Sequence, residues 1–211
     1  MFMALSITAP ISTSAVFTLI PIMSAVFGFF LLKQIVRPAV ALSLIVAGFG
    51  AIWVIFNGDL DAILAFRIGK GELIYFVGCV FHALYAPLVR LFNRGEPVAV
   101  TTFFVLALTG LWIIVYGFGD ILATDWAHLP PVVWWVIGFL SIFASVMTFF
   151  LLQIGSLRLP ASKVLAYGYL VPVSVILLEG LSGHGWASLS VMIGAGVTVL
   201  GLVLLYLMPD K

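Results

Sequence analysis

Three polar side chains recur on one face of a long apolar segment and are the first candidates for chemistry. Cys79, His82 and Tyr85 follow one another at intervals of three residues, so a helix places them on the same side. A histidine titrates near neutral pH, which suits contact with a substrate or a role in proton coupling. The alternative is a neutral His82 bonded to a carbonyl of a neighbouring helix. Both interpretations stay open from the residues alone.

Hydroxyl groups form two further stripes at helical spacing. Ser141, Ser145 and Thr148 recur at i, i+4 and i+7, and Tyr167 and Ser174 lie two turns apart beside a proline. Such stripes either line a water-filled path or let two helices approach closely. We therefore predict that Ser141, Ser145, Tyr167 and Ser174, together with His82 and Tyr85, face a substrate cavity.

Three prolines lie inside long apolar segments. A proline lacks the N–H of a helix turn, so Pro21, Pro87 and Pro172 are predicted to kink their helices. The alternative is that a membrane helix simply tolerates them. Glu179 is the single carboxylate within an apolar segment, where it either reaches toward the membrane surface or couples protons.

Motifs for covalent chemistry are incomplete in this sequence. The string Gly117–Asp120 resembles the GxGD signature of intramembrane aspartyl proteases, but no second aspartate lies inside an apolar segment. No HExxH, GxSxG or phosphate-binding loop occurs, and the final segment 187–207 has no lysine for a retinal Schiff base. We expect a protein that is not an enzyme, with no cofactor and no metal.

Composition places most of the surface in lipid. Of 211 residues, 64% are hydrophobic and only 8% are charged, whereas a soluble domain carries roughly 25% charged residues. The net charge of +1 argues against nucleic acid as a partner, because that binding needs clustered basic residues. The partners expected are therefore the lipid bilayer and a small-molecule substrate.

The apolar stretches predict an all-α polytopic membrane bundle. About 20 helical residues cross a hydrocarbon core of about 30 Å, and seven stretches reach that length. They are Ser12–Leu32, Pro38–Phe56, Leu73–Phe92, Val98–Phe118, Val132–Ile154, Ala161–Leu181 and Ala187–Leu207. The connector Asn57–Glu72 is too short to span, so it is either a helix on the membrane surface or a loop.

The basic residues predict the orientation. If the spans alternate, seven of the nine basic residues lie on one side. These are Lys33, Arg37, Arg90, Arg94, Arg158, Lys163 and Lys211. By the positive-inside rule this side, with the C-terminus, is cytoplasmic, and the N-terminus is outside. The expected location is the inner (plasma) membrane.

The chain also resembles itself at an offset of 151 positions. The matched pairs are Ala15 with Ala166, Leu19 with Leu170, Pro21 with Pro172, and Gly50 with Gly201. In the predicted topology the first span runs inward and its counterpart runs outward. The sequence therefore predicts two inverted copies, an arrangement common among transporters.

These features resemble the EamA-type branch of the drug/metabolite transporter superfamily. ALSIT at residues 4–8, then Pro21, Lys33–Gln34 and Gly50, follow the order of the family pattern at the end of one repeat. Its second copy is represented by Ala161, Pro172, Gly185, Gly194 and Gly201. The segment GKGELIYFVGCVFHALYAPLVRLF is similar to the opening helix of a repeat, with Ala83, Tyr85 and Arg90 in their expected places.

The resemblance implies a fold of ten helices in two inverted five-helix repeats. This chain then holds the remainder of the first repeat in residues 1–58 and the second repeat in residues 70–208, and the first three helices are expected to be missing. The family's Gly-Glu pair also has Gln34 in one copy and Gly185 in the other, and His82 stands where members often have tryptophan.

The function implied by the resemblance is secondary transport of small organic metabolites or drugs by alternating access, in the direction of export. Two alternatives stay open. One is a truncated, non-transporting fragment. The other is a membrane interaction protein that completes its bundle with a partner, for example as a homodimer.

Overall fold

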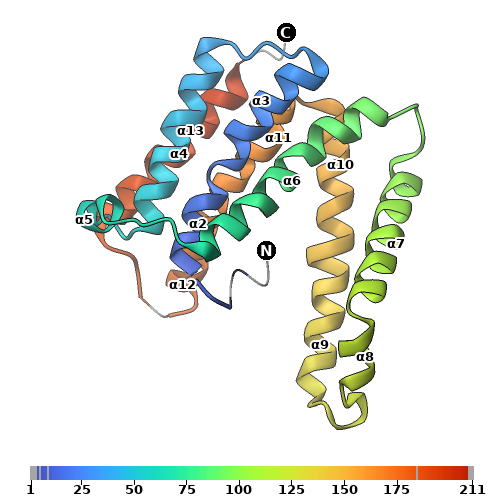
Figure 1. The fold of residues 1–211 in the computed structure, drawn as a ribbon. Coiled ribbons are helices and arrows are strands. Elements are labelled where there is room, and N and C mark those ends of the chain that lie inside the picture. Colours follow the sequence, from blue (N-terminus) through green and yellow to red (C-terminus); the bar gives the residue numbers. More distant parts are fainter. Residues whose placement is uncertain (1–3, 5, 9, 184, 209–211) are drawn as a thin grey trace. The chain divides into compact units, whose positions relative to one another are not determined.

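The computed structural model describes residues 4, 6–8, 10–183 and 185–208, so Lys211, which was counted in the orientation argument, lies outside the described residues. Helices make up the architecture throughout this part of the chain (Figure 1). The long elements are α2 (Pro10–Phe17), α3 (Ile20–Leu32), α4 (Pro38–Ile55), α6 (Lys70–Phe92), α7 (Val98–Tyr116), α9 (Pro131–Phe139), α10 (Thr148–Arg158), α12 (Leu170–Leu181) and α13 (Leu189–Leu207). Shorter ones connect or interrupt them: α5 (Leu60–Leu64), α8 (Phe118–Ala123), η1 (Trp126–His128), η2 (Leu140–Met147), α11 (Ala161–Ala166) and η3 (Tyr167–Tyr169).

Seven helical segments among the described residues are long and apolar enough to cross a membrane, as predicted. They are Ile11–Leu32, Pro38–Ile55, Lys70–Phe92, Val98–Tyr116, Pro131–Arg158, Ala161–Leu181 and Leu189–Leu207. The fifth runs further than predicted, because the helix continues to Arg158. The connector Asn57–Glu72 is partly helical and partly a loop. It contains the five-residue α5, at whose start the Asp59 side chain accepts a hydrogen bond of 3.0 Å from the N–H of Ala62.

The fifth span also contains a π-helical segment that the sequence pattern did not predict. Its central segment η2 is a π-helix, in which the main-chain hydrogen bonds run from i to i+5. At its end the Thr148 hydroxyl donates to the carbonyl of Phe143, five residues earlier, at 3.0 Å. The GFGD string lies at a helix end, as expected, since α7 ends at Tyr116 and α8 begins at Phe118.

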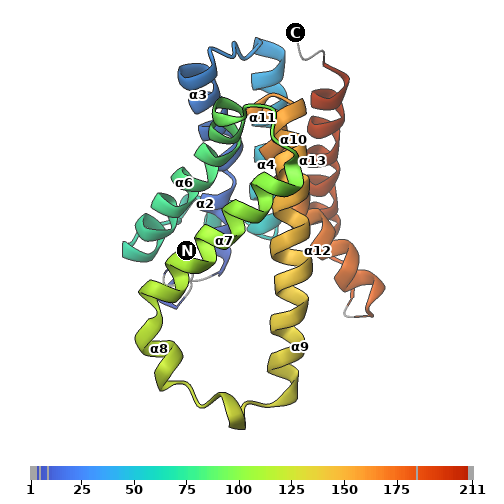
Figure 2. The same ribbon diagram turned by 90° about the vertical axis from the view of Figure 1, so that its right-hand side faces the viewer.

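The chain forms two compact units. The first comprises Met1–Leu91 and Leu159–Lys211, and the second comprises Phe92–Arg158. The second unit consists of two spans, α7 and α9–η2–α10, joined through α8 and η1 (Figure 2). Within it the Thr102 hydroxyl donates to the side-chain carbonyl of Gln153 at 2.7 Å, and both residues are buried. This polar contact links α7 to α10.

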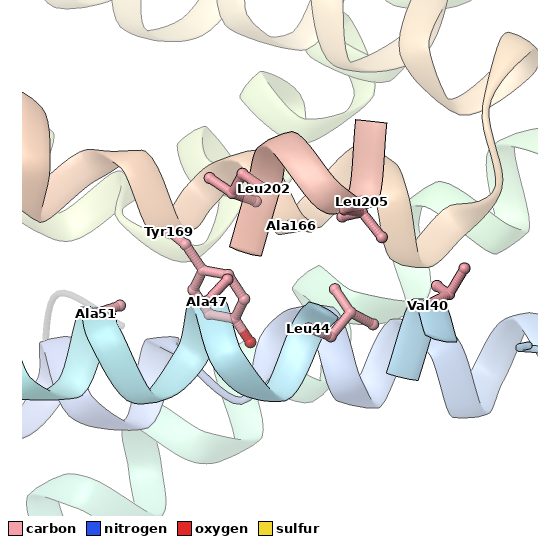
Figure 3. Close-up of a cluster of buried hydrophobic side chains, with 8 residues drawn as sticks. All are labelled: Val40, Leu44, Ala47, Ala51, Ala166, Tyr169, Leu202 and Leu205. Atoms are coloured by element: carbon pink, nitrogen blue, oxygen red, sulfur yellow. The ribbon is translucent and has the colours of Figure 1, made fainter. Parts of the chain in front are cut away.

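The first unit is organised around the antiparallel pair α4 and α13. The two helices run in opposite directions, because residues early in α4 contact the end of α13 and residues late in α4 contact its start. Ser43 contacts Met208, and the Trp53 side chain donates a hydrogen bond of 3.1 Å to the carbonyl of Ser190. Between these ends lies a cluster of buried side chains that also includes two residues from α11 and η3 (Figure 3). Its members are Val40, Leu44, Ala47, Ala51, Ala166, Tyr169, Leu202 and Leu205.

Glycines allow α4 and α13 to touch along their main chains. A Cβ atom on Gly50 would lie 2.7 Å from the main-chain nitrogen of Thr198, and a Cβ atom on Gly201 would lie 2.7 Å from that of Ala47. Gly50 and Gly201 are the matched glycines of the repeat, and Ala47 and Thr198 have the same offset of 151. Each copy therefore makes the same contact with the other, which is the reciprocity expected of a two-fold relationship.

Candidate functional site

Both copies interrupt their first helix just before the matched proline. In the first copy α2 ends at Phe17 and α3 begins at Ile20, ahead of Pro21. In the second copy the 3₁₀ segment η3 separates α11 from α12, ahead of Pro172. A proline supplies no N–H, so the helix bond to the carbonyl four residues earlier cannot form. The carbonyls that lose this helix bond are those of Phe17 and Gly168, and these two residues are themselves equivalent by the offset of 151.

Pro87 behaves differently from the other two prolines. It lies within α6, which continues from Lys70 to Phe92 without an interruption. The broken helices are therefore the two that carry the matched prolines.

A cavity of about 460 Å³ lies between these two broken helices, within the first unit. Phe17, Pro21, Gly168 and Pro172 all line it, together with residues of α4 and the start of α6. This volume falls in the range of about 300–1,000 Å³ typical of small-molecule sites. The interrupted helix turns of both copies therefore line the same cavity.

Most of the lining is apolar, and the polar groups are few. The polar side chains of the lining belong to Ser14, Thr18, Asn57, Tyr75, Tyr169 and Glu179. Asn57 follows α4, Tyr75 lies near the start of α6, and Glu179 lies near the end of α12. Since α4 ends and α6 begins on the same side of the membrane, Asn57 and Tyr75 mark one end of the cavity.

The opposite end of the first unit is closely packed. Gln34 accepts a hydrogen bond of 3.3 Å from the N–H of Ala161, and a Cβ atom on Gly28 would lie 3.5 Å from that of Ala161. The buried ammonium of Lys163 donates to the carbonyl of Met208 at 2.5 Å. The buried cluster of α4 and α13 continues from this end toward the cavity, where Tyr169 belongs to both (Figure 3).

Neither His82 nor Tyr85 is part of the cavity lining. Both are half-buried in α6. The ring of His82 lies 5.9 Å from that of Phe17, centroid to centroid, and Phe17 lines the cavity. Their predicted contact with a substrate therefore stays a prediction.

The other predicted positions are dispersed. Ser141 and Ser145 belong to the π-helix of the second unit, whereas Tyr167 and Ser174 are exposed residues of η3 and α12 in the first. Their neighbours Gly168 and Val175 line the cavity. The structure thus brings the prolines of the two copies to one cavity but does not gather the six predicted polar residues there.

Sequence reasoning missed Tyr75 and Asn57 as cavity residues. Tyr75 precedes Cys79 by four residues and His82 by seven, so the polar stripe identified on this span could have been extended to it. Asn57 carried no such signal, because it follows the last helical residue of α4 and its place depends on where that helix ends. Its φ of 54° is the left-handed conformation that asparagine adopts more readily than most residues.

Comparison with known proteins assigns the chain to a family. A model described as the EamA-like transporter family matches residues 69–207, more than half of the chain. The chain belongs to this family. It is also 29% identical over 203 residues to a protein of Bacillus subtilis (strain 168) named "Uncharacterized transporter YyaM".

The similarity to the Bacillus protein extends along most of this chain but covers only part of the relative. It spans 96% of the residues here and 66% of that protein. A solved crystal structure shares the fold, with a TM-score of 0.75 at 22% identity, over 96% of this chain and 69% of its own. The EamA-like chain is therefore a multi-pass membrane protein of a transporter family.

Proposed function

We propose that this EamA-like protein is a secondary transporter that moves small organic metabolites or drugs across the inner membrane by alternating access. The observation that carries the proposal is the cavity between two broken helices of antiparallel copies. Transporters with inverted repeats bind their substrates at such places, where unwound backbone supplies polar groups inside the membrane. No residue performs covalent chemistry in this scheme.

The two ends of the first unit suggest how access alternates. One end holds the cavity, and the other is joined by the Lys163–Met208 and Gln34–Ala161 hydrogen bonds. Under the positive-inside rule the packed end faces the cytoplasm and the cavity faces outward. This corresponds to an outward-facing state from which a substrate is released, the direction that export requires. Breaking the cytoplasmic contacts as the repeats rock would open the other side.

Flux into liposomes tests the proposal. We expect the reconstituted protein to move at least one solute of a broad panel of small organic metabolites faster than empty vesicles do. Ser14→Trp should abolish this flux, because Ser14 lines the cavity and an indole would occupy it. Leu200→Trp is the matched control, since Leu200 is exposed on α13 and lies outside that cavity. Flux equal to that of empty vesicles for the whole panel would refute the proposal.

A second candidate is a membrane interaction protein that completes its bundle with a second copy of the chain. Native mass spectrometry in mild detergent distinguishes the two: a dimer together with absent flux favours the interaction protein, whereas a monomer that sustains flux favours the transporter.

A further inference from the structure

A second concave region of the first unit is an apolar groove between α3 and α4, separate from the cavity between the broken helices. Its volume is about 530 Å³, and every residue that lines it is apolar. These residues belong to α3, to the first half of α4, and to Ile35 and Val36 in the connector that joins the two helices. The groove therefore offers hydrocarbon contacts and no hydrogen-bonding side chain.

The groove extends from the membrane surface into the hydrocarbon core. One end lies at the connector, next to Phe30, and Ile22 lies eight residues earlier on α3. At a rise of about 1.5 Å per residue, these eight residues span about 12 Å along the helix. One leaflet of a hydrocarbon core of about 30 Å has a similar depth. The groove thus follows the direction and the depth of a lipid acyl chain.

The connector between α3 and α4 exposes its basic residues beside the groove. Lys33, Ile35 and Arg37 are exposed, whereas Gln34 and Val36 are half-buried. The Gln34 side chain accepts a main-chain hydrogen bond, and Val36 packs against the buried cluster of α4 and α13. Lys33 and Arg37 therefore lie on either side of an exposed isoleucine that lines the groove.

No carboxylate offsets these two charges along the neighbouring helices. The sequence has no aspartate or glutamate from Met1 to Phe56, and neither Lys33 nor Arg37 forms an ion pair with another residue that the structure describes. The equivalent connector of the second copy, residues 182–188, contains no lysine or arginine. The turn between the helices therefore does not itself require basic residues.

We infer that this groove binds an anionic phospholipid, whose acyl chain lies between α3 and α4 and whose phosphate is bound by Lys33 and Arg37. A guanidinium can donate two hydrogen bonds to one phosphate, and an ammonium adds a point charge. Under the positive-inside rule both residues lie at the cytoplasmic leaflet, whose anionic lipids attract basic residues next to a span. The inference concerns a lipid site and does not depend on the proposed transport.

Two lipids with the same acyl chains and different headgroup charge provide the test. Native mass spectrometry is carried out on the full chain in mild detergent with equal amounts of phosphatidylglycerol and phosphatidylcholine. We expect phosphatidylglycerol to be retained at least about tenfold in preference to phosphatidylcholine. Inorganic phosphate should not displace it, because phosphate has no chain for the groove. Equal retention of the two lipids, or displacement by phosphate, would overturn the inference.

Charge variants locate the headgroup. Lys33→Gln combined with Arg37→Gln should leave the two lipids retained about equally, whereas Lys33→Arg combined with Arg37→Lys keeps both charges and should keep the preference. The matched control is Arg67→Gln combined with Lys70→Gln, which removes the same charges from two exposed residues of the connector between α4 and α6. An unchanged preference in the first double variant would refute the role of Lys33 and Arg37.

Variants of the groove locate the acyl chain. Ala41→Phe on α4 and Ala25→Phe on α3 each fill the groove from one wall and should weaken retention of phosphatidylglycerol at least about tenfold, although both basic residues remain. Ala107→Phe is the control, since Ala107 is exposed on α7 and lies outside the groove lining. The use of both walls separates a filled groove from a folding defect at one position. Unchanged retention in both groove variants, or a dimer without bound lipid, would show that the groove holds no phospholipid.

Discussion

The hydroxyl of Tyr169 donates a hydrogen bond of 2.9 Å to the main-chain carbonyl of Thr18, and these two residues occupy equivalent positions 151 apart in the two copies. Residues related by a two-fold axis can touch each other only close to that axis. The axis that relates the copies therefore passes near this bond, beside the interrupted turns that precede Pro21 and Pro172. The contact also ties the two broken helices together at the cavity.

Removal of this hydroxyl should destabilise the first unit. Tyr169 is 2% exposed, so Tyr169→Phe leaves the carbonyl of Thr18 without this donor in a buried place. We expect a loss of about 1 kcal/mol in the free energy of unfolding, seen as a lower melting temperature in detergent. Tyr167→Phe, two residues earlier and 42% exposed, is the control and should melt like the parent protein. Equal melting of all three proteins would contradict a stabilising role for the bond.

The close contact between α4 and α13 gives a second prediction. Gly50→Ala and Gly201→Ala each place a Cβ atom 2.7 Å from main-chain atoms of the other helix, so the helices must separate. We expect each to lower the free energy of unfolding by about 1–3 kcal/mol. Gly196→Ala is the matched control on α13, because nothing lies within 4 Å of its added Cβ atom.

The outcome of the pair also tests the symmetry. Because Gly50 and Gly201 make reciprocal contacts, the two substitutions should lower the free energy of unfolding by similar amounts. The double variant should lower it by less than the sum of the two single effects. The control Gly196→Ala should be neutral or slightly stabilising, since alanine favours a helix over glycine. A control that destabilises as much as the two interface variants would show that helix contact is not the cause.

The sequence was sufficient for the spans and for the relationship between the copies. Long apolar runs that lack a period of two form helices in lipid, so the number of spans followed directly and their bounds to within about four residues. Pro21 and Pro172 marked equivalent positions of the two copies, because a proline that interrupts a helix is a rarer signal than an apolar residue. The structure places both at one cavity and pairs their helices in antiparallel fashion.

The polar residues of the site were harder to predict. Periodicity states which residues share a face of one helix, but it does not state which face meets the cavity. His82 is an example. It shares a helix face with Tyr75, which lines the cavity, yet His82 itself is outside the lining and contacts the ring of Phe17. Glu179 was identified, but its position along the span favoured a reach toward the surface over a functional role.

A third prediction concerns the second unit. Thr102 and Gln153 form a buried hydrogen bond between α7 and α10, and neither residue was singled out by its spacing. A double-mutant cycle with Thr102→Val and Gln153→Leu should give a coupling energy of about 0.6–1.7 kcal/mol, the range for hydrogen bonds between membrane helices. The control pair is Thr101→Val with Gln153→Leu, because the Thr101 hydroxyl bonds to the carbonyl of Pro97 in its own helix. Strict additivity in the first cycle would show that the bond does not stabilise the unit.

The orientation of the chain gives the last prediction, and it decides to which side the cavity opens. Cys79 is the one cysteine of the sequence and is fully buried, so Cys79→Ala provides a background without a reactive thiol. In that background a membrane-impermeant maleimide applied to intact cells should label Ser182→Cys, in the turn after α12, but not Arg94→Cys. The connector that holds Arg94 belongs to the side with seven of the nine basic residues, and the positive-inside rule assigns that side to the cytoplasm. After the cells are lysed, both positions should react, because Ser182 and Arg94 are both exposed. The reverse pattern in intact cells would turn the cavity toward the cytoplasm, and the structure would then represent the state that loads a substrate for export and not the state that releases it.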